Sequence, residues 1–350
     1  MKENDQKLIT EHTLHRTDVK ELLKLMKAPY KRGDRIAVKL HWGERGNHSF
    51  LPPFYAKEIV AWLLSIGVNP VVFDTTVLYS GGRRQGADSI ATAARHGYTK
   101  EYLGCPVIIG DGLDGKDTIE IDAGFKHFKS VQVAALLDRV DGFFIFSHFT
   151  GHMAAGFGGA IKNISMGFAS RAQKQRMHAD VSPELNREKC TACGVCMECC
   201  PSGAITLSEG EFPSFNLDMC IGCAQCIAMC PQEALKVLWG TDKMKFQERL
   251  VETAAAVWRI IGEKSVLVNA LVSLSAECDC LPGPRERFLD DLGFIGGYDP
   301  LSLDVASLQM IGEKRISSLH PGVPWQRQIQ YANEIGFRKN SGSNEKNDFI

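Results

Sequence analysis

Residues 190–201 read CTACGVCMECCP, and residues 220–231 read CIGCAQCIAMCP. Each stretch places cysteines at positions i, i+3, i+6 and i+10, and a proline follows the last cysteine directly. Residues 190–207 and 220–237 align without a gap, matching at the four cysteines, at that proline and at one alanine. The alignment defines an internal repeat with a thirty-residue period. We interpret this repeat as a metal-binding segment around which the rest of the chain is organised.

The cysteine spacing is that of bacterial two-cluster ferredoxins, so the stretch resembles a module that holds two 4Fe–4S clusters. In that pattern three thiolates bind one cluster, and the fourth cysteine, which precedes the proline, binds the other cluster. Thiolates are the soft ligands that iron–sulfur clusters select. Cys199 aligns with Met229, and we therefore expect it to pack and not to bind iron. The predicted ligands are Cys190, Cys193, Cys196 and Cys230 for the first cluster, and Cys220, Cys223, Cys226 and Cys200 for the second.

A pair of zinc sites is the alternative interpretation of the repeat, because CxxC pairs also bind zinc tetrahedrally. The register of the eight cysteines, with each half closed by Cys-Pro, favours iron–sulfur clusters over zinc.

Length and composition are those of a globular protein with one large and one small domain. The chain has 350 residues, of which 44% are hydrophobic and 23% are charged, and these are ordinary values. A net charge of −1 favours neither nucleic acid nor an anionic membrane as a partner. The N-terminus lacks the apolar core of a signal peptide, and no apolar run approaches the ~20 residues of a membrane span. Twelve cysteines therefore predict metal binding in the cytoplasm and not disulfides.

Outside the repeat, strand-like runs alternate with helical ones, which predicts an α/β fold with a mostly parallel sheet, flanking helices and an inserted α+β ferredoxin-like double-cluster domain. The predicted divisions are 1–180 and 241–338 for the α/β domain, 181–240 for the insertion and 339–350 for a polar, disordered tail. Predicted strands cover 35–43, 69–76, 105–112, 142–149, 265–274 and 292–300, with a hairpin over 118–130; predicted helices cover 19–28, 53–67, 87–97, 131–140, 244–261, 301–312 and 324–336.

Polar side chains collect after the predicted strands. In open parallel sheets, ligands bind beyond the carboxyl ends of the strands, so these side chains are predicted to share one edge and to form a site. They are His41, Glu44, His48, Asp74, Thr75, Arg83, Arg84, Asp111, His148, His152, Cys278, Asp279, Cys280, Asp299 and Asp304.

His41, Glu44, His148 and His152 are the candidates for acid/base or ligand roles. The alternative for the first two is that they are solvated turn residues beside glycines. His148 and His152 are four residues apart, the spacing of a metal pair on a helix, although Gly151 between them argues against a regular helix.

Two segments are candidate anion or cofactor sites. Arg83 and Arg84 follow two glycines and could bind an anion or be surface charge. A second glycine-rich segment could present backbone N–H groups to a phosphate at a helix start, or let two backbones approach closely. No dinucleotide fingerprint and no P-loop is present. The candidate residues of that second segment are Gly158, Gly159, Lys162 and Asn163.

Cys278 and Cys280 are separated by one residue, which we expect to be too close for a comfortable disulfide. Three interpretations stay open: a third metal site, a redox thiol pair, or simple packing.

The α/β portion, over about residues 35–335, resembles the domain-of-unknown-function 362 family, and in particular its members with an inserted double 4Fe–4S ferredoxin domain. The resemblance implies iron–sulfur electron transfer in a low-oxygen setting and names no substrate. One departure is CLPGPRERF over residues 280–288, where a more polar, aromatic-containing segment is expected. The segments that carry the resemblance are KLHWGERGNHSFLPP (39–53), FDTTVLYSGGRR (73–84), VIIGDGL (107–113), SHFTGHMAAGFGGAIKNISMG (147–167), ECDC (277–280) and DPLSLDVAS (299–307).

The leading hypothesis is an iron–sulfur oxidoreductase in which two 4Fe–4S clusters relay electrons between a redox partner protein and a small-molecule site on the α/β domain. The alternative is a non-catalytic electron carrier or adaptor that docks a partner redox enzyme. A third hypothesis gives the clusters a structural or oxygen-sensing role. The sequence fixes neither the substrate nor the direction of electron flow, because cluster potentials depend on hydrogen bonds and exposure.

Overall fold

The computed structural model describes residues 13–180, 183–238 and 242–337. Within these residues, seven strands form a central sheet in which five neighbouring strands run parallel and one inner strand, β13, runs antiparallel. The predicted α/β class with a mostly parallel sheet is confirmed. The spatial order is β1 (Thr13–Arg16), β13 (Gly293–Gly297), β12 (Ser265–Leu271), β7 (Gly142–His148), β2 (Arg35–Lys39), β3 (Asn69–Asp74) and β4 (Val107–Ile109).

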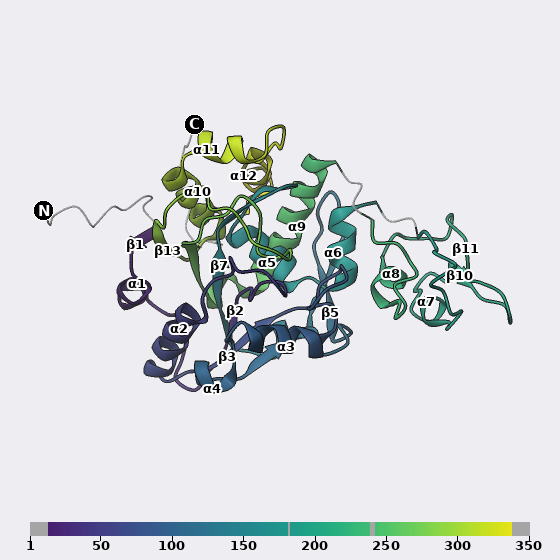
Figure 1. Cartoon of the computed structure of the whole chain (residues 1–350), viewed down its shortest axis with the longest axis horizontal. Coiled ribbons are helices and arrows are strands. Elements are labelled where there is room, and N and C mark those ends of the chain that lie inside the picture. The colour runs from purple at the N-terminus through teal and green to yellow at the C-terminus, as the bar shows by residue number, and fades with distance from the viewer. Residues whose placement is uncertain (1–12, 181–182, 239–241, 338–350) are drawn as a thin grey trace, which may run out of the picture.

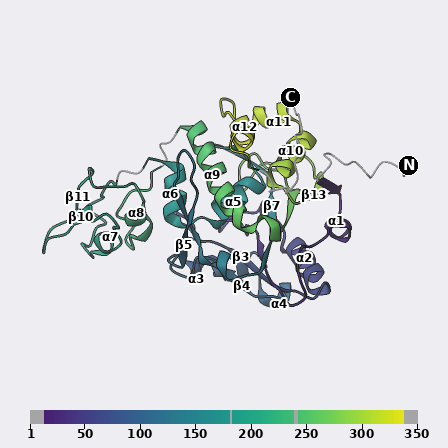
Figure 2. The same cartoon turned by 180° about the vertical axis from the view of Figure 1, so that it is seen from behind.

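Helices cover both faces of the sheet, because successive strand residues point to opposite sides and both sides are apolar (Figures 1 and 2). In β2, for example, Ile36 and Val38 belong to one core while Ala37 belongs to the other. The first face packs against α1 (Val19–Leu25), α2 (Pro53–Ser65), α3 (Gly86–Arg95) and α4 (Lys100–Leu103), and the second against α5 (Ala160–Phe168), α6 (Arg171–His178), α9 (Lys243–Ile261), α10 (Pro300–Ile311), α11 (Glu313–Leu319) and α12 (Gln326–Glu334).

Helix α9 illustrates how local sequence sets an element that was predicted over 244–261. Asp242 precedes it, and its side chain accepts hydrogen bonds from the backbone N–H groups of Met244 and Lys245, which satisfies donors that a helix start otherwise leaves open. Most of its length is buried against α5 and α12. A short 3₁₀ helix, η2 (Gly262–Lys264), leads from it into β12.

The predicted helix over 131–140 is wrong. The segment forms a strand, β6 (Ser130–Ala134), and then a 3₁₀ turn, η1 (Ala135–Asp138). Val131 and Val133 are buried on either side of the half-buried Gln132, which is the alternation of a strand. Strand β6 pairs antiparallel with β5 (Thr118–Asp122), so the predicted hairpin exists but extends further along the chain.

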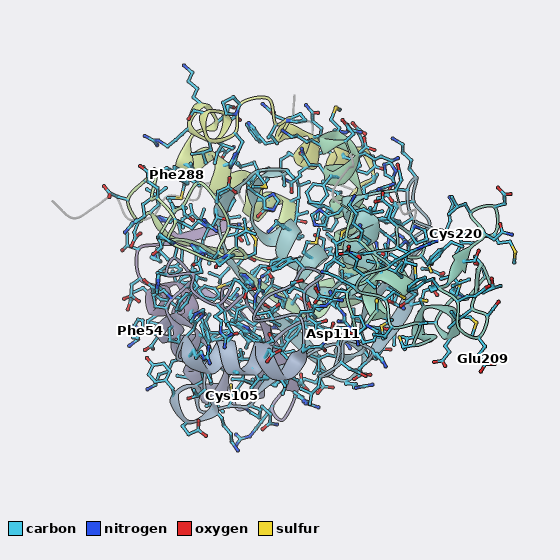
Figure 3. The ribbon with its side chains drawn as sticks, turned by 45° about the vertical axis from the view of Figure 1, so that its right-hand side comes forward. Phe54, Cys105, Asp111, Glu209, Cys220 and Phe288 are labelled. Carbon is cyan, nitrogen blue, oxygen red and sulfur yellow. A yellow bond between two sulfur atoms is a disulfide. The ribbon has the colours of Figure 1, made fainter. Side chains whose placement is uncertain are left out.

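Residues 183–238 form a lobe with its own small core, to one side of the sheet (Figure 1). Its two ends meet: the Lys236 N–H donates to the Glu184 carbonyl at 2.9 Å, as expected where a segment leaves and re-enters a domain. Figure 3 places Cys220 and Glu209 on this lobe, away from Asp111 of the α/β domain. The lobe contains α7 (Val195–Glu198), α8 (Gln225–Met229), β10 (Ile205–Thr206) and β11 (Ser214–Phe215).

The lobe contacts the α/β domain through α6. Ala172 of α6 packs against Ala224 and Ala228, and the Gln175 side chain exchanges two hydrogen bonds with the backbone of Leu238, at 2.8 and 3.0 Å. The predicted domain limits stay predictions, and the predicted tail, 339–350, lies outside the described residues. No helix in the described part of the chain has the length and apolarity that crossing a membrane requires.

Candidate functional site

A cavity of about 350 Å³ opens at the carboxyl ends of the parallel strands, where the sequence predicts a site. Residues that follow β2, β3, β7 and β12 line it, together with the short strands β8 (Thr150–His152) and β9 (Gly156–Gly158). Glu44, His48 and Arg84 are not among its lining residues. The predicted residues that line it are His41, Asp74, Thr75, Arg83, His148, His152, Gly158, Gly159, Lys162, Asn163, Cys278, Asp279 and Cys280.

Asp74, at the end of β3, is the centre of a buried ion network. Its carboxylate lies 3.0 Å from Lys39 Nζ, 3.0 Å from His41 Nδ1 and 3.6 Å from an Arg83 η-nitrogen. Burial alone would raise the pKa of Asp74, but the three cationic or hydrogen-bonding neighbours hold that pKa well below its usual range. Asp74 is therefore ionised, and it orients the His41 ring toward the cavity.

A second carboxylate, Asp279, connects the two predicted histidines. Asp279 lies 3.0 Å from His148 Nδ1 and 3.5 Å from His41 Nε2. The other nitrogen of His148 lies 2.9 Å from the Val272 carbonyl, so both His148 nitrogens are engaged. His41 Nε2 is buried and has no hydrogen-bond partner among the described residues. Burial lowers the pKa of His41, and the positive charge of Arg83 lowers it further. The ring is therefore mainly neutral and can exchange a proton at Nε2.

Glu44 is a positioning residue, and its predicted acid/base role is not what the structure shows. Its carboxylate is buried behind the cavity wall, where it accepts hydrogen bonds from the backbone N–H of Gly82 at 2.7 Å and from Arg83 Nε at 3.1 Å. It thereby holds the glycine-rich loop and aims Arg83 at Asp74. His48 is exposed and does not line the cavity.

Arg83 and Arg84 point in different directions, which the sequence could not reveal. Arg83 lines the cavity, whereas Arg84 faces the lobe: its Nε lies 2.8 Å from Glu233, and an η-nitrogen donates to the Cys230 carbonyl at 3.4 Å. Ser80 of the same loop also donates to Glu233. The loop therefore contacts both the cavity and the cysteine repeat.

The backbone N–H groups at the start of α5, one of the two candidate anion sites, already bind the side chain of Asp304. The backbone N–H groups of Ala160 and Ile161 donate to the Asp304 carboxylate at 2.7 and 3.0 Å. Gly159 is required for this approach, because a Cβ there would lie 2.3 Å from Asp304 Oδ1. Of the two interpretations that the sequence left open, the structure shows a close approach, with Asp304 on these helix-start N–H groups. Lys162 and Asn163 line the cavity.

His148 and His152 do not share a helix, as Gly151 between them indicated. His148 ends β7 and His152 ends β8, so no helix aligns the two rings. His152 Nδ1 accepts hydrogen bonds from the N–H groups of Ala154 and Ala155 at 3.2 and 3.1 Å, which leaves it no lone pair for a metal on that side.

Two lysines of the cavity escaped sequence reasoning. Lys39 ends the apolar strand β2, where a charge reads as a strand boundary, and its Nζ donates to the Asn163 side chain at 2.9 Å. Lys174 lies on the polar helix α6, yet its Nζ is buried and donates to Thr75 Oγ1, the Thr76 carbonyl and the Ala169 carbonyl at 2.6–2.8 Å. The sequence gives one signal for Lys39: this lysine interrupts the apolar run that was predicted as a strand over 35–43.

Lys162 differs from the other cavity cations because its Nζ has no hydrogen-bond or ion-pair partner among the described residues. Burial lowers its pKa to about 8, against the attraction of Asp279. Below pH about 8 it is an ammonium that can hold an anion, and above it a neutral amine.

We expect acylation of Lys162 by an amine-selective reagent to rise with a midpoint near pH 8, because only the neutral amine reacts. Peptide mass analysis across pH measures it, and Lys162→Arg removes the labelled position. A midpoint near the ~10.4 of an ordinary lysine would contradict the assignment.

Each predicted set of four cysteines in the lobe surrounds one cavity. Cys190, Cys193, Cys196 and Cys230 line one cavity, and Cys200, Cys220, Cys223 and Cys226 line another. Cys199 lines neither, and its Sγ contacts the Cys196 carbonyl at 3.5 Å. No three His, Cys, Asp or Glu side chains in the described residues converge as for a single metal ion. Four cysteines around one cavity are the donor set that a cube of iron and sulfur requires at its corners.

The thirty-residue repeat extends to the backbone around these cavities. Asn186 Oδ1 accepts from the N–H groups of residues 188 and 189, and Asn216 Oδ1 accepts from those of residues 218 and 219. The N–H groups of Ala192 and Ala234 donate to the sulfurs of Cys190 and Cys230 at 3.4 and 3.3 Å. Hydrogen bonds to ligand sulfurs are one of the factors that set the potential of an iron–sulfur cluster. Positive φ angles recur in register at the pairs 192 and 222, 194 and 224, and 203 and 233.

Cys278 and Cys280 form a disulfide, although a pair separated by one residue was expected to be too close to bridge comfortably. Both line the large cavity. In this oxidised form their sulfurs carry no thiolate for a metal, and the third metal site stays an untested prediction.

The fold and the cavity define an α/β protein with a charged site at the carboxyl edge of its sheet and a cysteine-rich lobe beside it. The chain belongs to the family described as Domain of unknown function (DUF362), whose model matches residues 36–309. No curated protein matches.

Two solved structures are similar at low identity. A crystal structure of a protein from Thermotoga maritima has a TM-score of 0.45 and 14% identity, over 87% of this chain and 60% of that one. The lactate racemase apoprotein from Thermoanaerobacterium thermosaccharolyticum has a TM-score of 0.39 and 9% identity, over 88% of this chain and 58% of that one. The chain thus spans about 60% of the first of these structures.

Proposed function

We propose that the protein is an iron–sulfur oxidoreductase whose lobe holds two 4Fe–4S clusters and relays electrons to or from the cavity on the α/β domain. The observation that carries the proposal is the grouping of the eight cysteines into two cavities of four, in the combination that the ferredoxin spacing requires. When bound, such clusters supply one-electron transfer; the cavity residues bind and orient the substrate and move its protons.

The loop over residues 78–84 supports a connection between the two sites. Arg83 lines the cavity, and its neighbour Arg84 donates to the carbonyl of Cys230, a predicted ligand of the first cluster. Leu78 also lines the cavity, and its carbonyl accepts a hydrogen bond from Arg84 at 2.5 Å. A single short segment therefore separates the first cluster site from the substrate site.

The charges of the cavity favour a small anionic substrate. Lys39 and Arg83 are neutralised by Asp74 and Glu44, whereas Lys162 has no carboxylate partner among the described residues. An incoming carboxylate or phosphate would supply that partner. His41 Nε2 is buried, forms no hydrogen bond with the described residues and lies 3.5 Å from Asp279; it is the proposed proton donor or acceptor.

The test is anaerobic. The clusters are reduced with a one-electron chemical reductant, a panel of small carboxylates and phosphate esters is added, and reoxidation is followed by visible absorbance. We expect at least one compound to reoxidise the clusters, and Lys162→Met to slow this about tenfold through loss of one charge-assisted contact. Lys116→Met, at an exposed lysine outside the cavity, is the matched control and should react as the wild type does.

A non-catalytic carrier gives a different result. No compound of the panel would reoxidise the clusters, and a ferredoxin-type protein partner would exchange electrons equally fast with the wild type and with Lys162→Met. That outcome would overturn the proposed enzyme.

A further inference from the structure

The Cys278–Cys280 disulfide is poorly explained as a structural bond. A disulfide stabilises a fold mainly by restricting the unfolded chain, and this effect grows with the length of the closed loop. Here the loop contains only Asp279, so the bond removes little entropy from the unfolded state. Its place in the cavity wall, among titratable side chains, calls for another role.

Hydrogen bonds that link Asp279 and Cys280 to other segments hold the backbone around the pair in place. Asp279, between the two cysteines, is buried and lies 3.0 Å from His148 Nδ1. The Cys280 carbonyl accepts hydrogen bonds from the Tyr79 hydroxyl at 2.5 Å and from an Arg83 η-nitrogen at 3.4 Å. Such anchoring can hold the two sulfurs near each other in both the oxidised and the reduced state.

The same loop joins the pair to the cysteine repeat. Arg83 donates to the Cys280 carbonyl, and Arg84, the next residue, donates to the Cys230 carbonyl at 3.4 Å. The disulfide-bonded Cys280 and the predicted cluster ligand Cys230 therefore contact neighbouring residues of one loop, Arg83 and Arg84.

We propose that Cys278 and Cys280 form a redox-active disulfide that stores two electrons in the wall of the substrate cavity. The source of its electrons rests on the proposed function. Reduction of the pair takes up two electrons and two protons from the solvent: the S–S bond breaks, and each sulfur becomes a thiol. If the lobe binds the two predicted clusters, they would supply these two electrons, one from each, so that two single-electron carriers would match one two-electron group. Reoxidation of the thiols by a substrate reverses these steps.

A single tryptic peptide reports the state of the pair. Cleavage after Lys264 and Arg285 releases residues 265–285, which contain Cys278 and Cys280 and no other cysteine. The anaerobic native protein is treated with a viologen radical, with a dithiol reductant, or with neither, and then alkylated and digested. Iron is measured in the same sample.

Without reductant we expect the peptide to be mainly disulfide-linked. Both reductants should raise the doubly alkylated fraction at least about tenfold, which a donor ~30 mV more reducing than the pair achieves. In Cys223→Ser, which lacks a predicted cluster ligand, the viologen response should slow while the dithiol response stays. Cys280→Ser should give one alkyl group without any reductant, and Cys105→Ser, at a buried cysteine outside the cavity, should behave as the wild type.

The outcomes separate the two proposals. A peptide that stays disulfide-linked under both reductants in iron-loaded protein, or that is doubly alkylated without reductant, overturns the redox pair and leaves the cluster proposal standing. Reduction of the pair by the dithiol in protein that holds no iron supports the pair and overturns the proposed function.

Discussion

Cys223→Ser should halve the iron content, from about eight to about four atoms per chain, because the hydroxyl is a poor substitute for one of the four soft thiolates around the second cavity. Cys223 lines that cavity with Cys200, Cys220 and Cys226. Iron and acid-labile sulfide measured after anaerobic purification give the result.

Cys199→Ser is the matched control for that variant. Cys199 belongs to the same lobe and packs against its small core, but it lines neither cavity. It should keep about eight irons per chain. An equal loss of iron in the two variants would contradict the assignment of ligands.

Asp74→Ala should lower the free energy of unfolding by about 3–5 kcal/mol, because it leaves buried positive charge without its counterion. The Lys39 and Asp74 side chains are 1% and 5% exposed, and their charged atoms lie 3.0 Å apart. His41 and Arg83 lose the same partner. Anaerobic denaturant titration followed by tryptophan fluorescence measures the change.

Asp117→Ala is the corresponding exposed change. It removes the ion pair with Arg139, whose two side chains are 55% and 39% exposed, and solvent-screened pairs of this kind contribute little. If Asp74→Ala were no more destabilising than Asp117→Ala, the buried network would not have the role given to it here.

The sheet and the position of the site could be predicted because their signals are local. Apolar strand runs that alternate with helices define a parallel sheet, and residues after each strand must then share an edge. His41, His148 and Asp279 do meet there, although they lie more than a hundred residues apart on either side of the cysteine repeat. The ferredoxin-type spacing likewise predicted the two sets of four cysteines that line the cavities of the lobe, and their binding of iron stays a prediction.

The missed features depend on tertiary contacts. Residues 131–134 carry a pattern short enough for a helix or a strand, and pairing with β5 decided it. Glu44 and Arg84 follow strands as the true cavity residues do, yet they turn toward the loop backbone and the lobe. The sequence pattern predicts that Lys174 is an exposed residue of a polar helix. In the structure its Nζ is buried and donates to Thr75, Thr76 and Ala169. The direction of these side chains depends on partners from distant segments, which the local sequence pattern does not identify.

Metal and sulfide analysis of the anaerobically purified wild-type protein tests the central claim most directly. Two 4Fe–4S clusters predict about eight iron and about eight sulfide per chain. About two zinc ions per chain, with neither iron nor sulfide, would contradict the claim, since the same cysteines would then form two tetrahedral zinc sites and no electron relay.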